Sequence, residues 1–167
     1  MKTSILLLLF GTLLLSSCVT LYKPNAVHSP LLTEKNELSV ATSMGISGSG
    51  LLNLQSAYAV SDHIGIMVNG MYHHRTSSSA DSSVERLNMY FGEMGVGYFS
   101  AFGKQKNGLF QCYGGGGGGY TFDKIDYPNQ PDPSVHANYV NLFVQPGIAF
   151  VNDYFQISLD LRANYIY

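Results

Sequence analysis

Apolar residues recur at every second position along most of this sequence, and that period constrains the fold more than any other feature. In the clearest run, 155–167, one parity is apolar: Phe155, Ile157, Leu159, Leu161, Ala163, Tyr165 and Tyr167. The other parity is mostly polar: Gln156, Ser158, Asp160, Arg162 and Asn164. Successive side chains of a strand point to opposite faces, so this period predicts a β-strand whose two faces meet different surroundings.

Seven such runs follow residue 35, and none of that sequence shows a sustained 3.6-residue apolar period. The runs are 36–46, 51–60, 64–73, 86–100, 109–122, 136–150 and 155–167. Pro146 cannot donate to a ladder, so we expect a local irregularity in the sixth run. Six consecutive glycines, 114–119, lie in the fifth run, where the parity of Cys112 and Tyr120 is unbroken. We therefore predict an all-β fold, an antiparallel up-and-down meander that includes the glycines as a strand.

The N-terminus is interpreted as a targeting segment. Lys2 precedes an apolar run that ends at Leu15, and this run is shorter than the ~20 residues of a spanning helix. The sequence Leu15-Ser16-Ser17-Cys18 resembles the bacterial lipobox, in which the cysteine becomes the acylated first residue. The alternative is an ordinary secretory signal with a cysteine nearby.

The lipobox divides the chain into three expected segments. Residues 1–17 are a lipoprotein signal peptide, residues 18–35 a lipid-anchored N-terminal linker, and residues 36–167 a β-barrel domain. Acylation of Cys18 would leave Cys112 without a partner, so no internal disulfide is expected.

Two architectures share this alternation. A soluble lipocalin-like barrel turns its apolar face inward, whereas an outer-membrane barrel turns it outward to lipid. The runs are about ten residues or longer, as a tilted spanning strand requires. Aromatic residues gather near the run ends, and only 12% of the residues are charged. We therefore expect a small outer-membrane-type barrel of about eight strands. Seven strands leave an open edge, so we expect a chain that is incomplete at its C-terminus, unless one strand has been missed.

Three charged residues take the polar parity of the predicted strands. Glu93, Asp160 and Arg162 should point into the lumen, where unpaired charges are costly. We expect a paired polar network that fills a narrow barrel, and the alternative is a binding site for a charged solute. The longer connections, 74–85 and 123–135, are expected to be surface loops.

No residue pattern indicates catalysis, a cofactor or a metal. His73 and His74 are adjacent on a predicted strand, so they point to opposite faces and cannot easily share one ion. Ser134, His136 and Glu85, with His74, supply the residue types of an outer-leaflet lipid enzyme but no recognisable spacing. The low charge also argues against binding nucleic acid, because no basic stretch could follow phosphates.

Several segments resemble a known family. They are 22–25 (YKPN), 29–32 (SPLL), 54–65 (LQSAYAVSDHIG), 145–148 (QPGI) and 157–162 (ISLDLR). Across most of the mature chain the sequence resembles small, uncharacterised outer-membrane β-barrel-domain lipoproteins of Bacteroidota-type bacteria. The resemblance implies an outer-membrane location and a chain that continues beyond residue 167, and it carries no catalytic residues.

Together these features predict a lipid-anchored bacterial outer-membrane β-barrel protein whose partner is outer-membrane lipid. The expected role is structural, adhesive or a scaffold for surface loops, without catalysis. The alternatives are a small-solute transport pore, an outer-leaflet lipid-modifying enzyme and a soluble lipocalin-like binding domain on a lipid tether. The sequence leaves any protein partner open.

Overall fold

The structure is a computed structural model that describes residues 26–45, 49–78, 83–127, 133–152 and 154–167, so the expected signal peptide and Cys18 lie outside the described residues. Its strands are β1 (Leu38–Gly45), β2 (Ser49–Ala59), β3 (Ile64–Ser78), β4 (Val84–Phe102), β5 (Gly108–Asp126), β6 (Ser134–Val151), β7 (Gln156–Asp160) and β8 (Ala163–Ile166). In these ranges no helix is long and apolar enough to span a membrane. The prediction of an all-β fold, with the glycine run as a strand, is confirmed.

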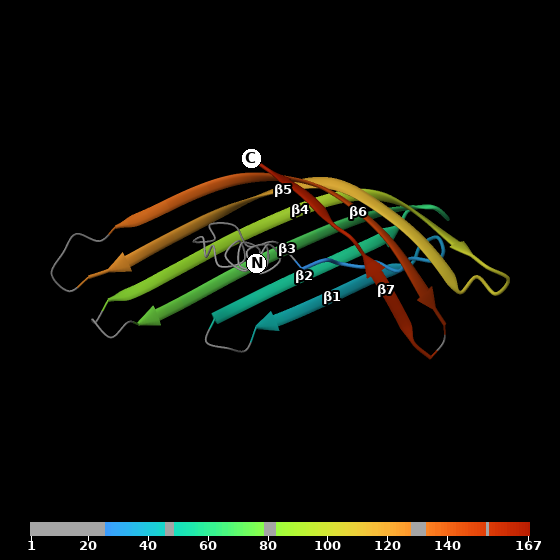
Figure 1. Cartoon of the computed structure of the whole chain (residues 1–167), viewed down its shortest axis with the longest axis horizontal. Coiled ribbons are helices and arrows are strands. Elements are labelled where there is room, and N and C mark those ends of the chain that lie inside the picture. The colour runs from blue at the N-terminus through green and yellow to red at the C-terminus, as the bar shows by residue number, and fades with distance from the viewer. Residues whose placement is uncertain (1–25, 46–48, 79–82, 128–132, 153) are drawn as a thin grey trace, which may run out of the picture.

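The strands form one antiparallel sheet in the order β1 to β7, with β8 also paired to β6. Figure 1 shows this sheet curled into an arch, with β7 crossing in front of the other strands. The predicted meander of seven strands is confirmed as a half-barrel with a concave and a convex face. In the described part of the chain no ladder joins β1 to β7. Both strands run in the same direction, so one strand of opposite direction would pair antiparallel with each.

The irregularity expected at Pro146 is a break in the strand that pairs with β6, not in β6 itself. The register of β6 with β7 continues without a shift into β8. The two strands are separated by Leu161 and Arg162, and Leu161 donates its N–H to the Pro146 carbonyl at 2.9 Å. Pro146 has no N–H to return to Leu161, so the ladder is interrupted there. β7 and β8 are therefore one strand with a break opposite the proline.

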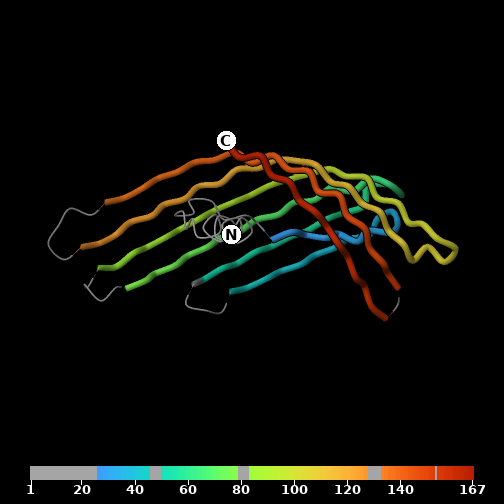
Figure 2. The backbone as a smooth tube through the Cα atoms, viewed as in Figure 1, coloured from blue at the N-terminus to red at the C-terminus, as the bar shows by residue number. Residues whose placement is uncertain are grey.

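The expected surface loops are shorter than predicted. β3 continues to Ser78 and β4 begins at Val84, so most of segment 74–85 is strand. The β5–β6 ladder likewise covers much of segment 123–135. The sequence did not predict these residues as strand, because the alternation of apolar and polar residues stops where a hairpin extends beyond the apolar band. The backbone hydrogen bonds between the two strands continue there. We call the ends of the strands on this side, where the β3–β4 and β5–β6 hairpins lie, the hairpin end. The opposite ends of the strands carry the turns after β2, β4 and β6, and we call them the turn end (Figure 2).

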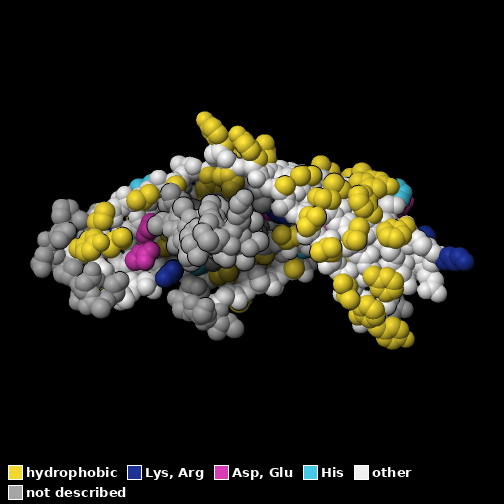
Figure 3. Space-filling model, in the orientation of Figure 1, with side chains coloured by type: hydrophobic (Ala, Val, Ile, Leu, Met, Phe, Trp, Pro, Cys, Tyr) yellow, Lys and Arg dark blue, Asp and Glu magenta, His cyan; other side chains and the backbone are white. Residues whose placement is uncertain are grey.

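Side chains alternate between the two faces along every long strand. On the convex face Ile66, Leu142 and Leu159 are 43%, 57% and 64% exposed, while the concave face buries polar residues such as Asn141 and Gln145. Figure 3 shows apolar side chains projecting from the rim of the molecule, above the sheet and where β6 meets β7. The exposed convex face is thus apolar, which is the reverse of a soluble barrel, while the concave face buries both polar residues and two apolar clusters.

Large rings on the concave face lie over glycines of the neighbouring strands. Tyr113 is fully buried, and a Cβ added at Gly97 would lie 2.3 Å from its ring and 2.7 Å from the Cys112 carbonyl oxygen. Gly92, on the same strand but the convex face, has nothing within 4 Å of such a Cβ. The side chain of Tyr113 therefore needs a glycine at position 97, whereas position 92 has room.

Gly97→Ala should lower the free energy of unfolding by about 1–3 kcal/mol, because the Tyr113 ring must leave its position. Gly92→Ala is the matched control and should change it by less than about 0.5 kcal/mol. Urea unfolding of both variants in detergent micelles measures the difference. Equal effects of the two substitutions would contradict this account of the concave packing.

Candidate functional site

Two rows of aromatic side chains border the convex face. At the hairpin end Tyr72 pairs with Tyr90, and Tyr90 with Tyr120, on three adjacent strands. The rings of Tyr72 and Tyr90 are 5.0 Å apart. At the turn end the exposed aromatic residues are Tyr58, Tyr98, Phe102, Phe110, Phe150 and Phe155. Aromatic rows of this kind mark the two interfaces of a membrane-spanning barrel.

The spacing of the rows matches a membrane. Tyr90 and Tyr98 are eight residues apart on β4, which is roughly 26 Å along a strand and about 20 Å after a tilt of ~40°. Phe102, four residues further on β4, extends this height to about 30 Å. The two values bracket the apolar band of ~25 Å that outer-membrane barrels present to lipid.

The convex face between these rows carries no charged side chain in the described strands. Charge appears on this face only beyond the tyrosine row, at the hairpin end. There Asp126 accepts from Arg86 at 3.2 Å and from Lys124 at 2.5 Å. Charged residues thus resume where a membrane headgroup region would begin.

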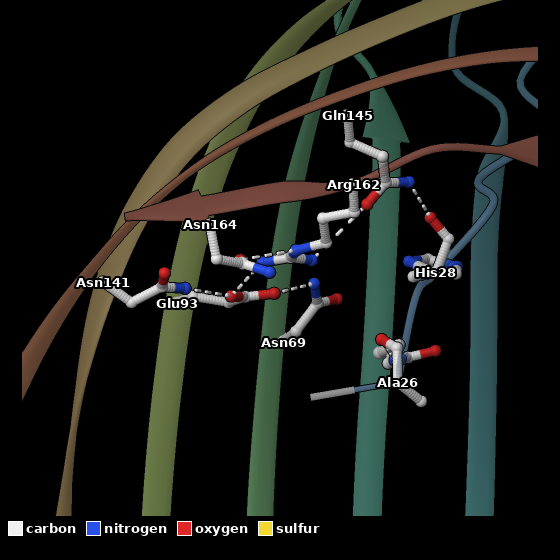
Figure 4. A network of polar contacts seen from close by, with 9 residues as sticks. Ala26, His28, Asn69, Glu93, Asn141, Gln145, Arg162 and Asn164 are labelled. Atoms are coloured by element: carbon white, nitrogen blue, oxygen red, sulfur yellow. Dashed lines mark hydrogen bonds and ion pairs between the residues drawn. The ribbon is translucent and has the colours of Figure 1, made fainter. Parts of the chain in front are cut away.

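The concave face holds a buried ion pair at its centre. The Arg162 guanidinium and Glu93 carboxylate meet at 2.5 Å, and their side chains are only 4% and 0% exposed. Asn69 donates to Glu93 at 2.8 Å and Asn141 to its second oxygen at 3.5 Å. Figure 4 shows these residues converging from separate strands. The carboxylate therefore has donors on both oxygens.

Arg162 has further partners besides Glu93. Its Nη1 donates to Gln145 at 3.4 Å and its Nε to Asn164 at 3.1 Å. Its guanidinium also stacks 3.9 Å from the centre of the Phe143 ring. This set of partners fixes β7 and β8 across the opening of the half-barrel.

The structure brings Glu93 and Arg162 together but gives Asp160 a different partner. Asp160 accepts from the Gln111 Nε2 at 2.7 Å, and the same nitrogen donates to Ser29 at 2.8 Å. All three residues of the expected polar network therefore take part in polar contacts on the concave face. The network also includes amide side chains that the sequence analysis did not single out.

Residues 26–32, which we call the strap, lie along the concave face. Three amide side chains from three strands hold it. Gln55 donates to the carbonyl of Ala26 and Gln145 to that of His28, each at 2.6 Å. Gln111 accepts from the N–H of Leu31 at 3.3 Å. Part of the expected linker 18–35 is thus packed against the barrel domain.

The strap also has apolar and conformational anchors. Leu32 is fully buried in the main apolar cluster at the turn end, beside Tyr113 and Phe99. Leu31 adopts a φ of 54°, a left-handed conformation that costs a non-glycine residue roughly 1–2 kcal/mol. The packing of Leu32 and the Gln111 contact offset this cost, so the strap is held in one defined conformation.

His28 is buried on the concave face and responds to pH. Burial lowers the pKa of His28 below its ordinary 6.5, while the neighbouring Asn69 and the Asp160 carboxylate raise it in part. A released ring takes up a proton at its ordinary pKa, whereas the docked ring resists protonation. Docking is therefore strongest above pH 6.5 and weakens as the pH falls from 6.5 toward the lowered pKa.

A nitroxide label at Val27→Cys, whose side chain is exposed, should therefore become more mobile between about pH 7.5 and about pH 5. Electron paramagnetic resonance of the label measures this change. His28→Leu removes the titrating group and should abolish the pH dependence. If the mobility of the label stays constant over this pH range in the chain that retains His28, docking of the strap does not depend on the protonation of His28.

Among the described residues the histidines are divided between the two faces of the sheet. His73 is buried on the concave face, while His74 contacts Asn88 on the convex face at 2.8 Å. His136 contacts the Tyr120 hydroxyl at 2.7 Å on the convex face, whereas Glu85 takes the concave parity of its strand. Within the described ranges no group of three His, Cys, Asp or Glu side chains is placed to hold a metal ion.

Sequence reasoning missed the strap and the amides that hold it. The alternation along each strand does predict that three glutamines point to the concave face: Gln55, Gln111 and Gln145. Their partners lie up to 117 residues away in sequence, and no local pattern marks that distance.

The polar network of the concave face, the strap and the apolar convex band are therefore the candidate functional features of the described residues. Family models, curated proteins and solved structures were each searched, and none matches this sequence.

Proposed function

We propose that this chain forms the wall of a small barrel in a bacterial outer membrane, anchored by acylated Cys18. Its role is structural, adhesive or that of a scaffold for the two long hairpins, without catalysis. The observation that carries this proposal is the uncharged convex band between two aromatic rows, about 20 Å to 30 Å in height. The resemblance to small outer-membrane β-barrel lipoproteins of Bacteroidota-type bacteria supports it too.

The apolar convex face favours this role over that of a soluble binding domain. A soluble lipocalin-like barrel would present a mainly charged exterior. Here Leu142 and Ile66 are exposed and Glu93 is buried. Exposed apolar area on this scale needs an apolar partner, and lipid acyl chains fit a face that is uncharged between the aromatic rows from β1 to β7.

The test is expression of the full chain in a Gram-negative host, with Cys18→Ala as the matched variant. We expect both proteins in the outer-membrane fraction after an alkaline wash, and radiolabelled palmitate only on the chain that retains Cys18. Release of Cys18→Ala into the aqueous fraction would contradict the membrane wall. Failure of the wild-type chain to take up palmitate would contradict the anchor alone.

A small-solute pore is the second candidate, and the polar lining of the concave face favours it. Asn69, Asn141 and the three glutamines would line a water-filled passage. The strap lies in that passage, so the pore and the closed wall differ in the position of one segment.

A further inference from the structure

We propose that the concave face is a binding groove for an extended peptide, and that the strap is its ligand in cis, which plugs the lumen. This inference rests on the proposed function, because a plug has meaning only in a wall between two compartments. Four observations support it, and each concerns residues 26–32 and the strands around them.

The groove recognises main-chain atoms. The Nε2 atoms of Gln55 and Gln145 each donate to a strap carbonyl at 2.6 Å, and Gln111 accepts from a strap N–H. All three side chains are more than nine-tenths buried, and they come from β2, β6 and β5. Amide groups that bind a backbone in this way recognise an extended peptide with little regard to its sequence.

Sequence preference comes from two side chains, four residues apart. His28 is buried beside the polar network and Leu32 is buried in the apolar cluster of the turn end. Leu32 is in tight contact there, because a Cβ at Gly65 would lie 2.8 Å from its Cδ1. The groove therefore accepts a peptide with a neutral imidazole at one position, a left-handed residue three positions later and a branched aliphatic side chain directly after it.

The strap occupies part of the concave face, which a closed barrel would enclose as its lumen. Its C-terminal residue Leu32 fills the apolar turn end, and the carbonyl of its first residue, Ala26, accepts from Gln55. Figure 4 shows Ala26 and His28 together with the polar network around Glu93 and Arg162. If the strap left, carboxamide side chains would line the vacated space.

The contacts also allow release. A permanently packed segment would be held mainly by apolar contacts. A carboxamide can instead exchange its hydrogen bond to a strap carbonyl for one to water, and each such hydrogen bond changes the equilibrium between docked and released strap by only about two- to tenfold. Val27, between the two anchored carbonyls, is exposed. The strap is thus held by several weak polar contacts and one apolar anchor.

The experiment compares full-length chains in liposomes of phosphatidylethanolamine and phosphatidylglycerol. Gln55→Leu with Gln145→Leu removes both carbonyl donors, and Leu32→Asn removes the apolar anchor from the strap side without changing the barrel. Gln156→Leu is the matched control, because it replaces an exposed glutamine of β7. The measurements are nitroxide mobility at Val27→Cys and flux of K⁺ and glucose.

We expect the wild-type chain and the control to show an immobile label and little flux. The double variant loses two hydrogen bonds to the strap, and Leu32→Asn loses its one apolar anchor. Both should show a mobile label and flux raised by about tenfold or more. A mobile label with unchanged flux, in a chain whose strands stay protected from trypsin, would overturn the plug and leave the proposed wall standing. A label that stays immobile in both variants would overturn the groove. Failure of the wild-type chain to insert would instead overturn the proposed function.

Discussion

Replacing Arg162 with methionine should lower the free energy of unfolding by about 3–5 kcal/mol, because it leaves the buried Glu93 charge without its cation. Both side chains are almost fully excluded from solvent, and Glu93 keeps only the two asparagine donors. The loss should detach β7 and β8 first, since Arg162 links that strand to Glu93 across the concave face. Denaturant titration of the refolded chain measures the change.

A double-mutant cycle provides the control for this result. Glu93→Gln keeps the size of the side chain and removes its charge. Combined with Arg162→Met it should restore most of the stability, because neither charge is then buried alone. If the double variant loses the sum of the two single losses, the two residues act independently and the central ion pair does not hold the strand.

Leu142→Arg should prevent stable insertion of the chain into a bilayer. Leu142 lies in the middle of the convex band, and an arginine facing lipid at that depth costs about 2–4 kcal/mol in an outer-membrane barrel. The same substitution on the surface of a soluble protein changes stability by less than about 0.5 kcal/mol. The yield of trypsin-protected protein after folding into liposomes distinguishes a position that faces lipid from one that faces water.

Thr76→Arg is the matched control, because residue 76 has the same parity on β3 but lies beyond the tyrosine row at the hairpin end. It should insert as well as the wild-type chain. Equal insertion of the two arginine variants would show that Leu142 does not meet hydrocarbon.

Much of the fold follows from the period of two, and its limits explain what the sequence could not predict. The period placed Ile66 and Leu142 on one face and Glu93 on the other, because a strand gives its side chains no other choice. It underestimated the hairpins past residue 73, because both faces of a protruding ribbon meet water and polar residues then occupy either parity. The bounds of β3 and β4 therefore depend on ladder bonds that composition does not reveal.

For the candidate site, too, the sequence predicted which face a side chain lies on but not which residue it contacts. The inward direction of Asp160 and Arg162 follows from parity, but their partners do not. Arg162 pairs with Glu93, 69 residues earlier, while Asp160 binds Gln111. The strap is the extreme case, since its polar anchors are 29 to 117 residues distant and residues 26–32 carry no strand period. Long-range pairing of polar groups depends on the curvature of the sheet, which one sequence does not encode locally.

Spin labels along β6 provide the most direct test of the central claim, that the convex face touches acyl chains and the concave face encloses polar groups. Single cysteines at positions 140–144, labelled in liposomes, report collisions with lipid-soluble oxygen and with a water-soluble nickel complex. The account predicts that oxygen contact is high at positions 140, 142 and 144 and low at 141 and 143. High contact of the nickel complex at 140, 142 and 144 would contradict it, because those side chains would then face water.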